Sequence, residues 1–194
     1  MKIQSIHLKH ILHFADLKVD FSYHDKPVTL ILGDQASGKT SILRFSYQAL
    51  TWFAARYKDL RSAGVVMLDH DIMRNRLQSK IDIQVAVPAE LYALKPTATD
   101  TATEPYAWQL YKTLNQQGIG ISRVETLKLE QLVNLYQQAT LQDPLQGLPL
   151  IAYYPAERFV NEMNILSKNN PLIFQHAHAY EISAIPYTTF ARFF

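Results

Sequence analysis

One stretch of this sequence organises the rest: Val28-Thr29-Leu30-Ile31-Leu32-Gly33-Asp34-Gln35-Ala36-Ser37-Gly38-Lys39-Thr40. Its five apolar or β-branched residues, 28–32, predict a buried strand. The spacing G-x-x-x-x-G-K-T that follows is that of a phosphate-binding loop, in which Gly33 and Gly38 let the backbone turn so that its N–H groups converge. A helix to about Tyr57 is predicted by apolar positions at helical spacing: Ile42, Phe45, Ser46, Ala49, Leu50 and Phe53.

This loop predicts a site for ATP and Mg²⁺. Lys39 is expected to neutralise the β- and γ-phosphates as the catalytic lysine, and the Thr40 hydroxyl to ligate the Mg²⁺. The positive end of the following helix adds to the attraction. The alternative is a glycine turn that binds nothing. The predicted nucleotide-binding residues are Gly33, Asp34, Gln35, Ala36, Ser37, Gly38, Lys39, Thr40 and Ser41.

Composition favours one substantial domain in a reducing compartment. The chain has 194 residues, of which 48% are hydrophobic, and a formal charge of only +2. This charge does not resemble the strongly basic surface of a dedicated DNA-binding domain, although nucleic acid is neither demanded nor excluded. The chain has no cysteine and no apolar run long enough to span a bilayer, and its first residues lack the apolar core of a signal peptide. We therefore expect a cytoplasmic protein without a membrane partner.

The chain is expected to form an α/β domain with an antiparallel β-subdomain and flanking helices. Two strands, residues 2–9 with a local bulge and residues 16–21, precede the loop and suit an antiparallel ribbon. Residues 81–87 alternate as a half-buried strand, and residues 106–111 are expected to return beside it as a hairpin. Its tip, residues 95–105, is small and polar and is predicted to be mobile.

The second half is expected to contain a helix and a second core strand. The helix is predicted by apolar residues on the i, i+3, i+4, i+7 template: Leu129, Leu132, Val133, Tyr136 and Ala139. Residues 148–154 predict the second buried strand, which ends at Pro155-Ala156-Glu157-Arg158. We divide the single domain 1–194 into three parts: 1–60 with the first strands, the loop and the first helix, 61–147 with the hairpin and helical part, and 148–194 with the second core strand and tail.

The motifs together resemble a family. The Met1-Lys2-Ile3 start and the loop continuing into Ser41-Ile42-Leu43 are similar to the N-terminal, P-loop lobe of ABC-type ATPases of the SMC/RecF-like and OLD-like group. Tyr153-Tyr154-Pro155-Ala156-Glu157-Arg158 resembles the Y-x-P-A-E-R element of bacterial predicted AAA/ABC ATPases, including anti-phage defence and virulence-associated ATPases. The resemblance implies ATP hydrolysis in a head-to-head homodimer or larger assembly that contacts through the nucleotide face, with an effector protein or nucleic acid as a further partner.

The chain departs from this family's pattern in several places. Ala36 stands where the group often has glycine, which requires a negative φ at this residue, and Gln35 replaces the usual asparagine. The sequence shows no signature motif, no apolar strand ending in Asp-Glu, and no switch histidine. Since these elements lie farther along in such families, we expect an N-terminal fragment or a truncated member. Glu157 is then a weak candidate for the catalytic acid, and Arg158 either contacts the γ-phosphate or forms a structural ion pair.

Other clusters favour structural interpretations. Asp69-His70-Asp71 is expected to be surface polar sequence, since three adjacent residues cannot all face one metal ion. His176 and His178 would share a strand face, yet a third zinc ligand is missing. Trp108 and its aromatic neighbours are expected in the core rather than stacked on a base.

Three functions remain open from the sequence. The first is the ATP-binding part of an ABC/SMC-like ATPase, which needs a C-terminal lobe and a dimer for hydrolysis. The second is a small-molecule P-loop kinase, which the position of the loop after two strands disfavours. The third is a nucleotide-gated binding module without turnover.

Overall fold

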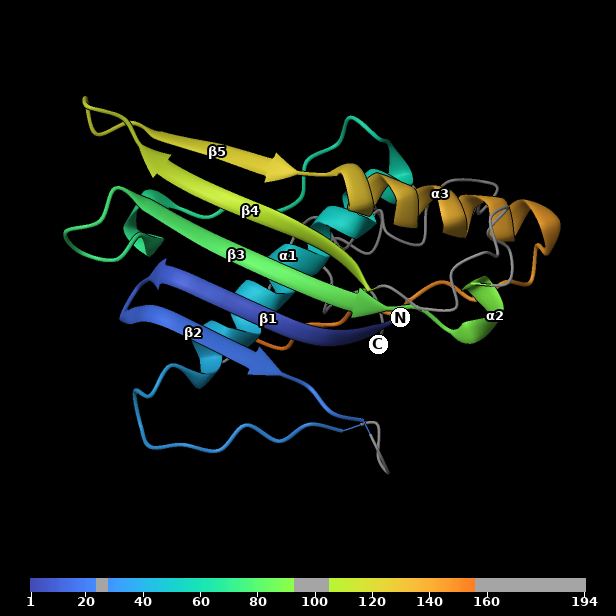
Figure 1. Cartoon of the computed structure of the whole chain (residues 1–194), viewed down its shortest axis with the longest axis horizontal. Helices are drawn as coiled ribbons and strands as arrows, with labels where there is room; N and C mark the ends of the chain where they lie inside the picture. The colour runs from blue at the N-terminus through green and yellow to red at the C-terminus, as the bar shows by residue number, and fades with distance from the viewer. Residues whose placement is uncertain (24–27, 93–104, 156–194) are drawn as a thin grey trace, which may run out of the picture.

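The fold is an antiparallel sheet with its longest helix behind one face and two further helices beyond one end of the strands (Figure 1). The computed structural model describes residues 1–23, 28–92 and 105–155. None of the helices in these ranges is long and apolar enough to cross a membrane. In chain order the elements are β1 (Lys2–Ile11), β2 (Phe14–Asp20), α1 (Lys39–Lys58), the 3₁₀ turn η1 (Asp69–Asp71), β3 (Gln78–Ala86), α2 (Ala89–Tyr92), β4 (Tyr106–Leu114), β5 (Gly120–Glu125) and α3 (Leu127–Gln142).

The five strands lie in the order β2-β1-β3-β4-β5, and every neighbouring pair is antiparallel. A register shift between Ile3 and Ser5 confirms the bulge predicted in the first strand. Beyond it, Ile6 and Leu8 of β1 point to the same buried face as the apolar residues of β3. Since side chains alternate along a strand, the other face carries the polar residues.

Helix α1 covers the buried face of the sheet and lies behind it in Figure 1. Trp108 of β4 is buried there, and its Nε1 donates to the carbonyl of Ala49 in α1 at 3.0 Å. Phe53 of α1 meets Tyr136 of α3 edge to face, with ring centroids 5.4 Å apart. These contacts confirm that Trp108 belongs to the core. All five apolar positions predicted for the second helix are buried: Leu129, Leu132, Val133, Tyr136 and Ala139.

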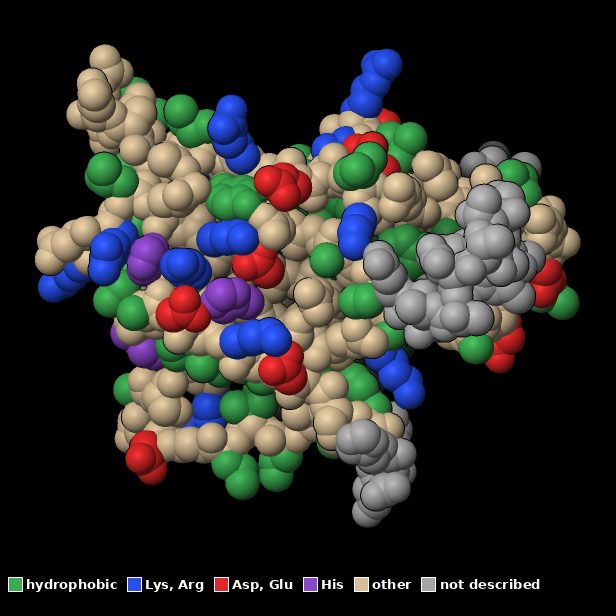
Figure 2. Space-filling model, viewed as in Figure 1, with side chains coloured by type: hydrophobic (Ala, Val, Ile, Leu, Met, Phe, Trp, Pro, Cys, Tyr) green, Lys and Arg blue, Asp and Glu red, His purple; other side chains and the backbone are tan. Residues whose placement is uncertain are grey.

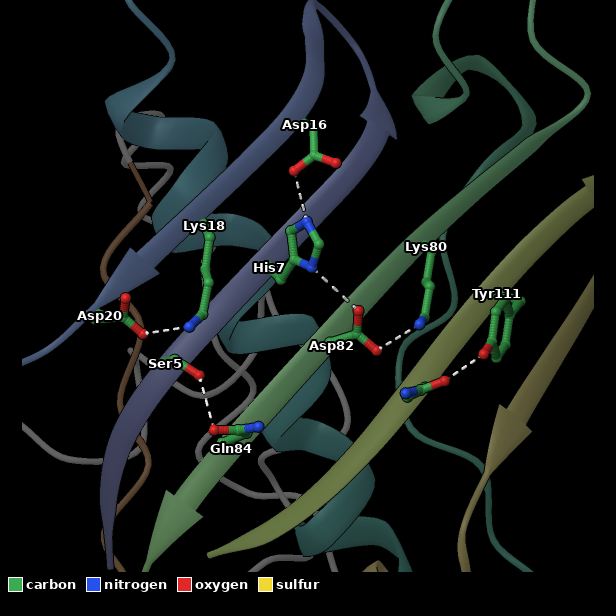
Figure 3. A network of polar contacts seen from close by, with 10 residues as sticks. Ser5, His7, Asp16, Lys18, Asp20, Lys80, Asp82, Gln84 and Tyr111 are labelled. Carbon is green, nitrogen blue, oxygen red and sulfur yellow. Dashed lines mark hydrogen bonds and ion pairs between the residues drawn. The ribbon is translucent and has the colours of Figure 1, made fainter.

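The outer face of the sheet carries a ladder of charged pairs (Figure 3). His7 of β1 lies between two carboxylates, with Nε2 at 2.7 Å from Asp16 of β2 and Nδ1 at 3.5 Å from Asp82 of β3. Lys80 pairs with the same Asp82 at 2.9 Å. The hydrogen bond with His7 lowers the pKa of Asp16 below its usual value. Figure 2 shows basic, acidic and histidine side chains interleaved over this face, which makes it a mixed, self-paired surface.

Most of the predicted elements are confirmed, with the exceptions below. The ribbon of β1 and β2, the helix after the loop, the β3–β4 hairpin and the helix at Leu127–Gln142 all form as predicted. The sequence did not predict β5 or the short α2. Strand β5 is an edge strand whose residues are mostly exposed, so its apolar alternation is weak.

The two predicted core strands are wrong for the described part of the chain. Residues 28–32 and 148–154 form no ladder there, and the side chains of Leu30 and Leu32 are 76% and 82% exposed, with Leu150 at 91%. A buried strand needs hydrogen-bonded neighbours and cover on both faces. The antiparallel sheet ends at β2 and β5, and neither segment joins it. Ile31, Leu148 and Ile151 are partly buried against the core, and Tyr153 stacks on Tyr47 of α1 with ring centroids 4.9 Å apart.

Several predictions fall outside the described residues. These are the polar turn at 24–27, all but the last residue of the tip at 95–105, Glu157 and Arg158, the pair His176 and His178, and the tail.

Candidate nucleotide site

The loop from Gly33 to Gly38 turns sharply before α1. Ser37 N donates to the Asp34 carbonyl at 3.3 Å, which closes a turn. Ala36 and Gly38 both take left-handed backbone angles, with φ of 62° and 91°. The prediction that Ala36 keeps a negative φ is therefore wrong. A left-handed residue at this position turns the backbone so that the N–H groups of the loop can converge. Alanine adopts that conformation at a cost of about 1 kcal/mol or more.

The N-terminus of α1 is chemically open to an anion. Gly38 occupies the N-cap position, no side chain caps the helix, and its first turn contains no acidic residue. The first N–H groups of a helix lack partners within the helix, and a capping or acidic side chain normally satisfies them. A 20-residue helix with neither leaves its positive end uncompensated. This is the arrangement that binds phosphate groups.

Lys39 folds back across the loop that it follows. Its Nζ donates to the carbonyls of Gly33 at 2.8 Å and Asp34 at 2.5 Å, and to the Ser37 hydroxyl at 3.2 Å. Since an ammonium group has three protons, the loop satisfies the group fully. The ammonium group is therefore held over the loop, where phosphate oxygens could replace these neutral acceptors with charged ones.

A cavity of about 330 Å³ opens at this point. It is lined by six consecutive residues, Ala36–Ser41, and by His13 from the turn between β1 and β2. Figure 1 shows the start of α1 close to this turn. The described residues that line the cavity supply two cationic or ionisable groups, Lys39 and His13, together with hydroxyls, and no carboxylate.

The structure brings most of the predicted loop residues together. Ala36, Ser37, Gly38, Lys39, Thr40 and Ser41 line the cavity. Gly33 and Asp34 contribute their carbonyls to Lys39, while Gln35 is exposed at the turn. Gly33 does not take a left-handed φ, so Gly38 is the loop glycine that needs one. The Thr40 hydroxyl suits a Mg²⁺ that keeps most of its waters, since it lines the same cavity as Lys39.

His13 and Phe14 are the site residues that sequence reasoning missed. A side-chain carbon placed on Gly38 would lie 2.2 Å from Phe14 Cζ and 2.6 Å from His13 Nε2. The hairpin turn therefore packs directly against the loop. No spacing rule links His13 to a loop more than 20 residues away, because the contact depends on the pairing of β1 with β2 and on where α1 crosses the sheet.

The Asp69-His70-Asp71 cluster has a structural role. Asp71 is fully buried, so its predicted place on the surface is wrong. Its Oδ1 accepts from Arg44 of α1 at 2.6 Å and its Oδ2 accepts from Leu68 N at 2.8 Å. Asp69 pairs instead with Lys112 at 2.9 Å. Within the described ranges, no group of three or more His, Asp or Glu side chains could hold a metal ion.

Comparisons with known proteins agree with this geometry. The AAA domain family matches residues 5–183. The chain is similar to the Retron Ec83 probable ATPase of Escherichia coli, with 23% identity over 81% of this chain and 26% of the relative. It is also similar to the Retron Vc95 probable ATPase of Vibrio cholerae serotype O1 biovar El Tor, with 24% identity over 82% of this chain and 29% of the relative. The chain thus spans about a quarter of the length of these curated relatives.

Two solved structures are similar to part of this chain. One comes from "Structural biochemistry of ATP-driven dimerization and DNA stimulated activation of SMC ATPases", with a TM-score of 0.39 and 14% identity over 70% of this chain and 79% of that one. The other is the SmcHead bound to the C-winged helix domain of ScpA, with a TM-score of 0.40 and 14% identity over 72% of this chain and 41% of that one.

Proposed function

The chain belongs to the AAA domain family, and from this premise we propose that it is the Mg-ATP-binding part of a larger ATPase. The family match gives an AAA domain, and both curated relatives are probable ATPases, in agreement with the predicted resemblance to ATPases. In our proposal the nucleotide binds through residues 33–41. Hydrolysis then requires a C-terminal lobe and a head-to-head dimer.

The observation that carries the proposal is the open N-terminus of α1 beside Lys39. An uncapped 20-residue helix, a left-handed glycine and a lysine ammonium converge on one cavity. Each of these features attracts an anion, and together they suit a polyphosphate better than a single carboxylate. When ATP enters, Lys39 would exchange its bonds to the Gly33 and Asp34 carbonyls for bonds to the β- and γ-phosphates.

The described residues account for nucleotide binding better than for hydrolysis. Thr40 would hold Mg²⁺, which when bound would neutralise charge on the β- and γ-phosphates. Phosphoryl transfer to water also needs a group that orients the attacking water. The described lining of the cavity contains no carboxylate that could do so. We infer that this group comes from outside the described residues, with Glu157 as a weak candidate, and that Arg158 meets either the γ-phosphate or a structural partner.

The exposed apolar segments favour a further lobe. Leu30, Leu32 and Leu150 lie in runs whose sequence suits a buried strand, yet their side chains are largely in solvent. Figure 2 shows hydrophobic side chains along the lower rim, where the segment before α1 runs in Figure 1. Additional strands beside residues 28–32 and 148–154 would bury these side chains. The greater length of the retron relatives is consistent with such a lobe.

The remaining features of the whole protein are also proposals. We place the protein in the cytoplasm, in bacterial defence, with an effector protein or nucleic acid as a further partner. The names of the two retron relatives support the assignment to bacterial defence. A second candidate, a nucleotide-gated binding module without turnover, is favoured by the same lack of a carboxylate in the described cavity lining.

Calorimetric titration of the chain with ATP and ADP in the presence of Mg²⁺ tests the binding claim. We expect saturable 1:1 binding that weakens at least tenfold in Lys39→Ala, because a charged donor to the phosphates is lost. Lys9→Ala is the matched control, since Lys9 is exposed on β1 outside the cavity and the substitution removes the same charge. Equal ATP affinity in wild type and Lys39→Ala would overturn the proposal.

A further inference from the structure

We propose that His13 is a direct nucleotide ligand, whose Nε2 donates a hydrogen bond to the α- or β-phosphate. The inference rests on the proposed function, because it assigns an additional contact in the same site. His13 is the one described residue outside the Ala36–Ser41 stretch that lines the cavity. It comes from the β1–β2 turn, a part of the chain that the loop motif does not include.

The imidazole lies against the loop backbone at a defined point. A carbon added to Gly38 would meet His13 Nε2 at 2.6 Å and Cε1 at 2.8 Å, so the tip of the ring faces the Cα of Gly38. The ring also packs against Phe14, with centroids 4.0 Å apart and planes at 44°. The ring therefore contacts both an aromatic neighbour and the loop glycine that takes a left-handed φ.

The turn that presents His13 is held in an uncommon backbone conformation. His10 and Leu12 both have positive φ, 53° and 51°, although neither is glycine. Two backbone hydrogen bonds keep them there: Leu12 N donates to Asp71 O, and Met73 N donates to His10 O, both at 2.8 Å. A left-handed conformation is unfavourable for a residue other than glycine, and it occurs most often at functional sites. The result of this turn is to place His13 at the mouth of the loop.

The ring nitrogens of His13 are available to a ligand. Among the described residues, His13 forms no hydrogen bond or ion pair. The ammonium group of Lys39, which also lines the cavity, is already satisfied by the loop, and no carboxylate of the described lining competes for the imidazole. A neutral or protonated imidazole with a free N–H beside a second cation suits an anionic ligand.

The position beside Gly38 indicates which phosphates His13 meets. In a loop of this spacing the backbone N–H groups hold the α- and β-phosphates, while the lysine reaches the β- and γ-phosphates. Because His13 abuts the loop backbone, its contact is to phosphates that ATP and ADP share. It therefore contributes to affinity for both nucleotides rather than to discrimination between them.

The test is calorimetry with MgATP and MgADP on full-length variants at position 13. We expect His13→Ala to weaken both nucleotides by a similar factor, roughly 3- to 10-fold, as for the loss of one exposed hydrogen bond to a charged group. His13→Gln places an amide N–H near the position of Nε2 and should recover most of the affinity. His13→Phe keeps an aromatic ring without a donor and should behave like His13→Ala.

Controls separate this contact from folding and from the proposed function. His70→Ala removes a histidine outside the cavity and should leave affinity unchanged. Thermal melts without nucleotide should show the position-13 variants folded. Wild-type affinity in His13→Ala, a loss confined to ATP, or equal loss in His13→Gln would each overturn the role of His13 while leaving Lys39-dependent binding intact. Failure of the wild type to bind would instead overturn the proposed function.

Discussion

Two residues of the loop, Gly38 and Ala36, have left-handed backbone conformations. Glycine is required at position 38 for two reasons: its φ is left-handed, and His13 and Phe14 leave no room for a side chain. Ala36 has the same left-handed backbone without the benefit of glycine. The loop residues themselves could be predicted from spacing, whereas the φ of Ala36 could not, since it depends on how the whole loop closes.

Ala36→Gly should stabilise the chain. Removing the methyl group relieves the left-handed strain, and the greater freedom of glycine in the unfolded chain offsets part of the gain, which leaves about 0.5 to 1 kcal/mol. Urea denaturation followed by circular dichroism measures this difference. Ala15→Gly in β2, where φ is not positive, should instead lose stability. A loss of stability in Ala36→Gly would show that the loop does not hold this residue in the left-handed conformation.

At the scale of elements, one buried ion pair joins α1 to the segment before β3. Arg44 lies one turn after Thr40, and its guanidinium meets Asp71 at 2.6 Å. The same carboxylate accepts the N–H of Leu68, and Asp71 O holds Leu12 in the hairpin turn. The start of α1, the η1 segment and the β1–β2 turn are therefore fixed to one another around the site.

Asp71→Ala should destabilise the fold by about 2 to 4 kcal/mol. The substitution leaves a half-buried guanidinium and a backbone N–H without their acceptor. Chemical denaturation provides the measurement. Asp20→Asn is the control, since the pair of Asp20 with Lys18 is exposed and should contribute less than about 1 kcal/mol. Similar losses in the two variants would show that the buried pair does not anchor these elements.

Sequence patterns predicted the elements whose burial is decided locally. Alternation predicted that Ile81, Ile83 and Val85 face the core, and helical spacing predicted the same for the residues around Leu132. Both predictions are confirmed. Apolar content alone wrongly predicted buried strands at residues 28–32 and 148–154. Burial of a strand depends on neighbouring strands and helices, which the sequence of the strand itself does not specify. The contact of His13 with the loop likewise depends on tertiary placement rather than on any local pattern.

At the scale of the whole molecule, the account rests on the cavity beside α1 and on the apolar side chains exposed near it. The cavity contains Lys39, Thr40 and the open end of α1, while its described lining lacks a carboxylate. Leu30, Leu32 and Leu150 are largely exposed, and in our proposal a further lobe covers them. These two observations together lead to the central claim, that the chain binds Mg-ATP but does not by itself complete the hydrolytic site.

Phosphate release by the purified 194-residue chain tests this claim most directly. It should be measured over a series of protein concentrations, with Lys39→Ala as the control for contaminating activity. A missing catalytic group costs roughly 10²- to 10⁴-fold, so the account predicts turnover well below about 1 s⁻¹ and close to that of Lys39→Ala. Turnover above about 1 s⁻¹ that disappears in Lys39→Ala would contradict the account, and Glu157 would then be the first residue to test as the catalytic acid.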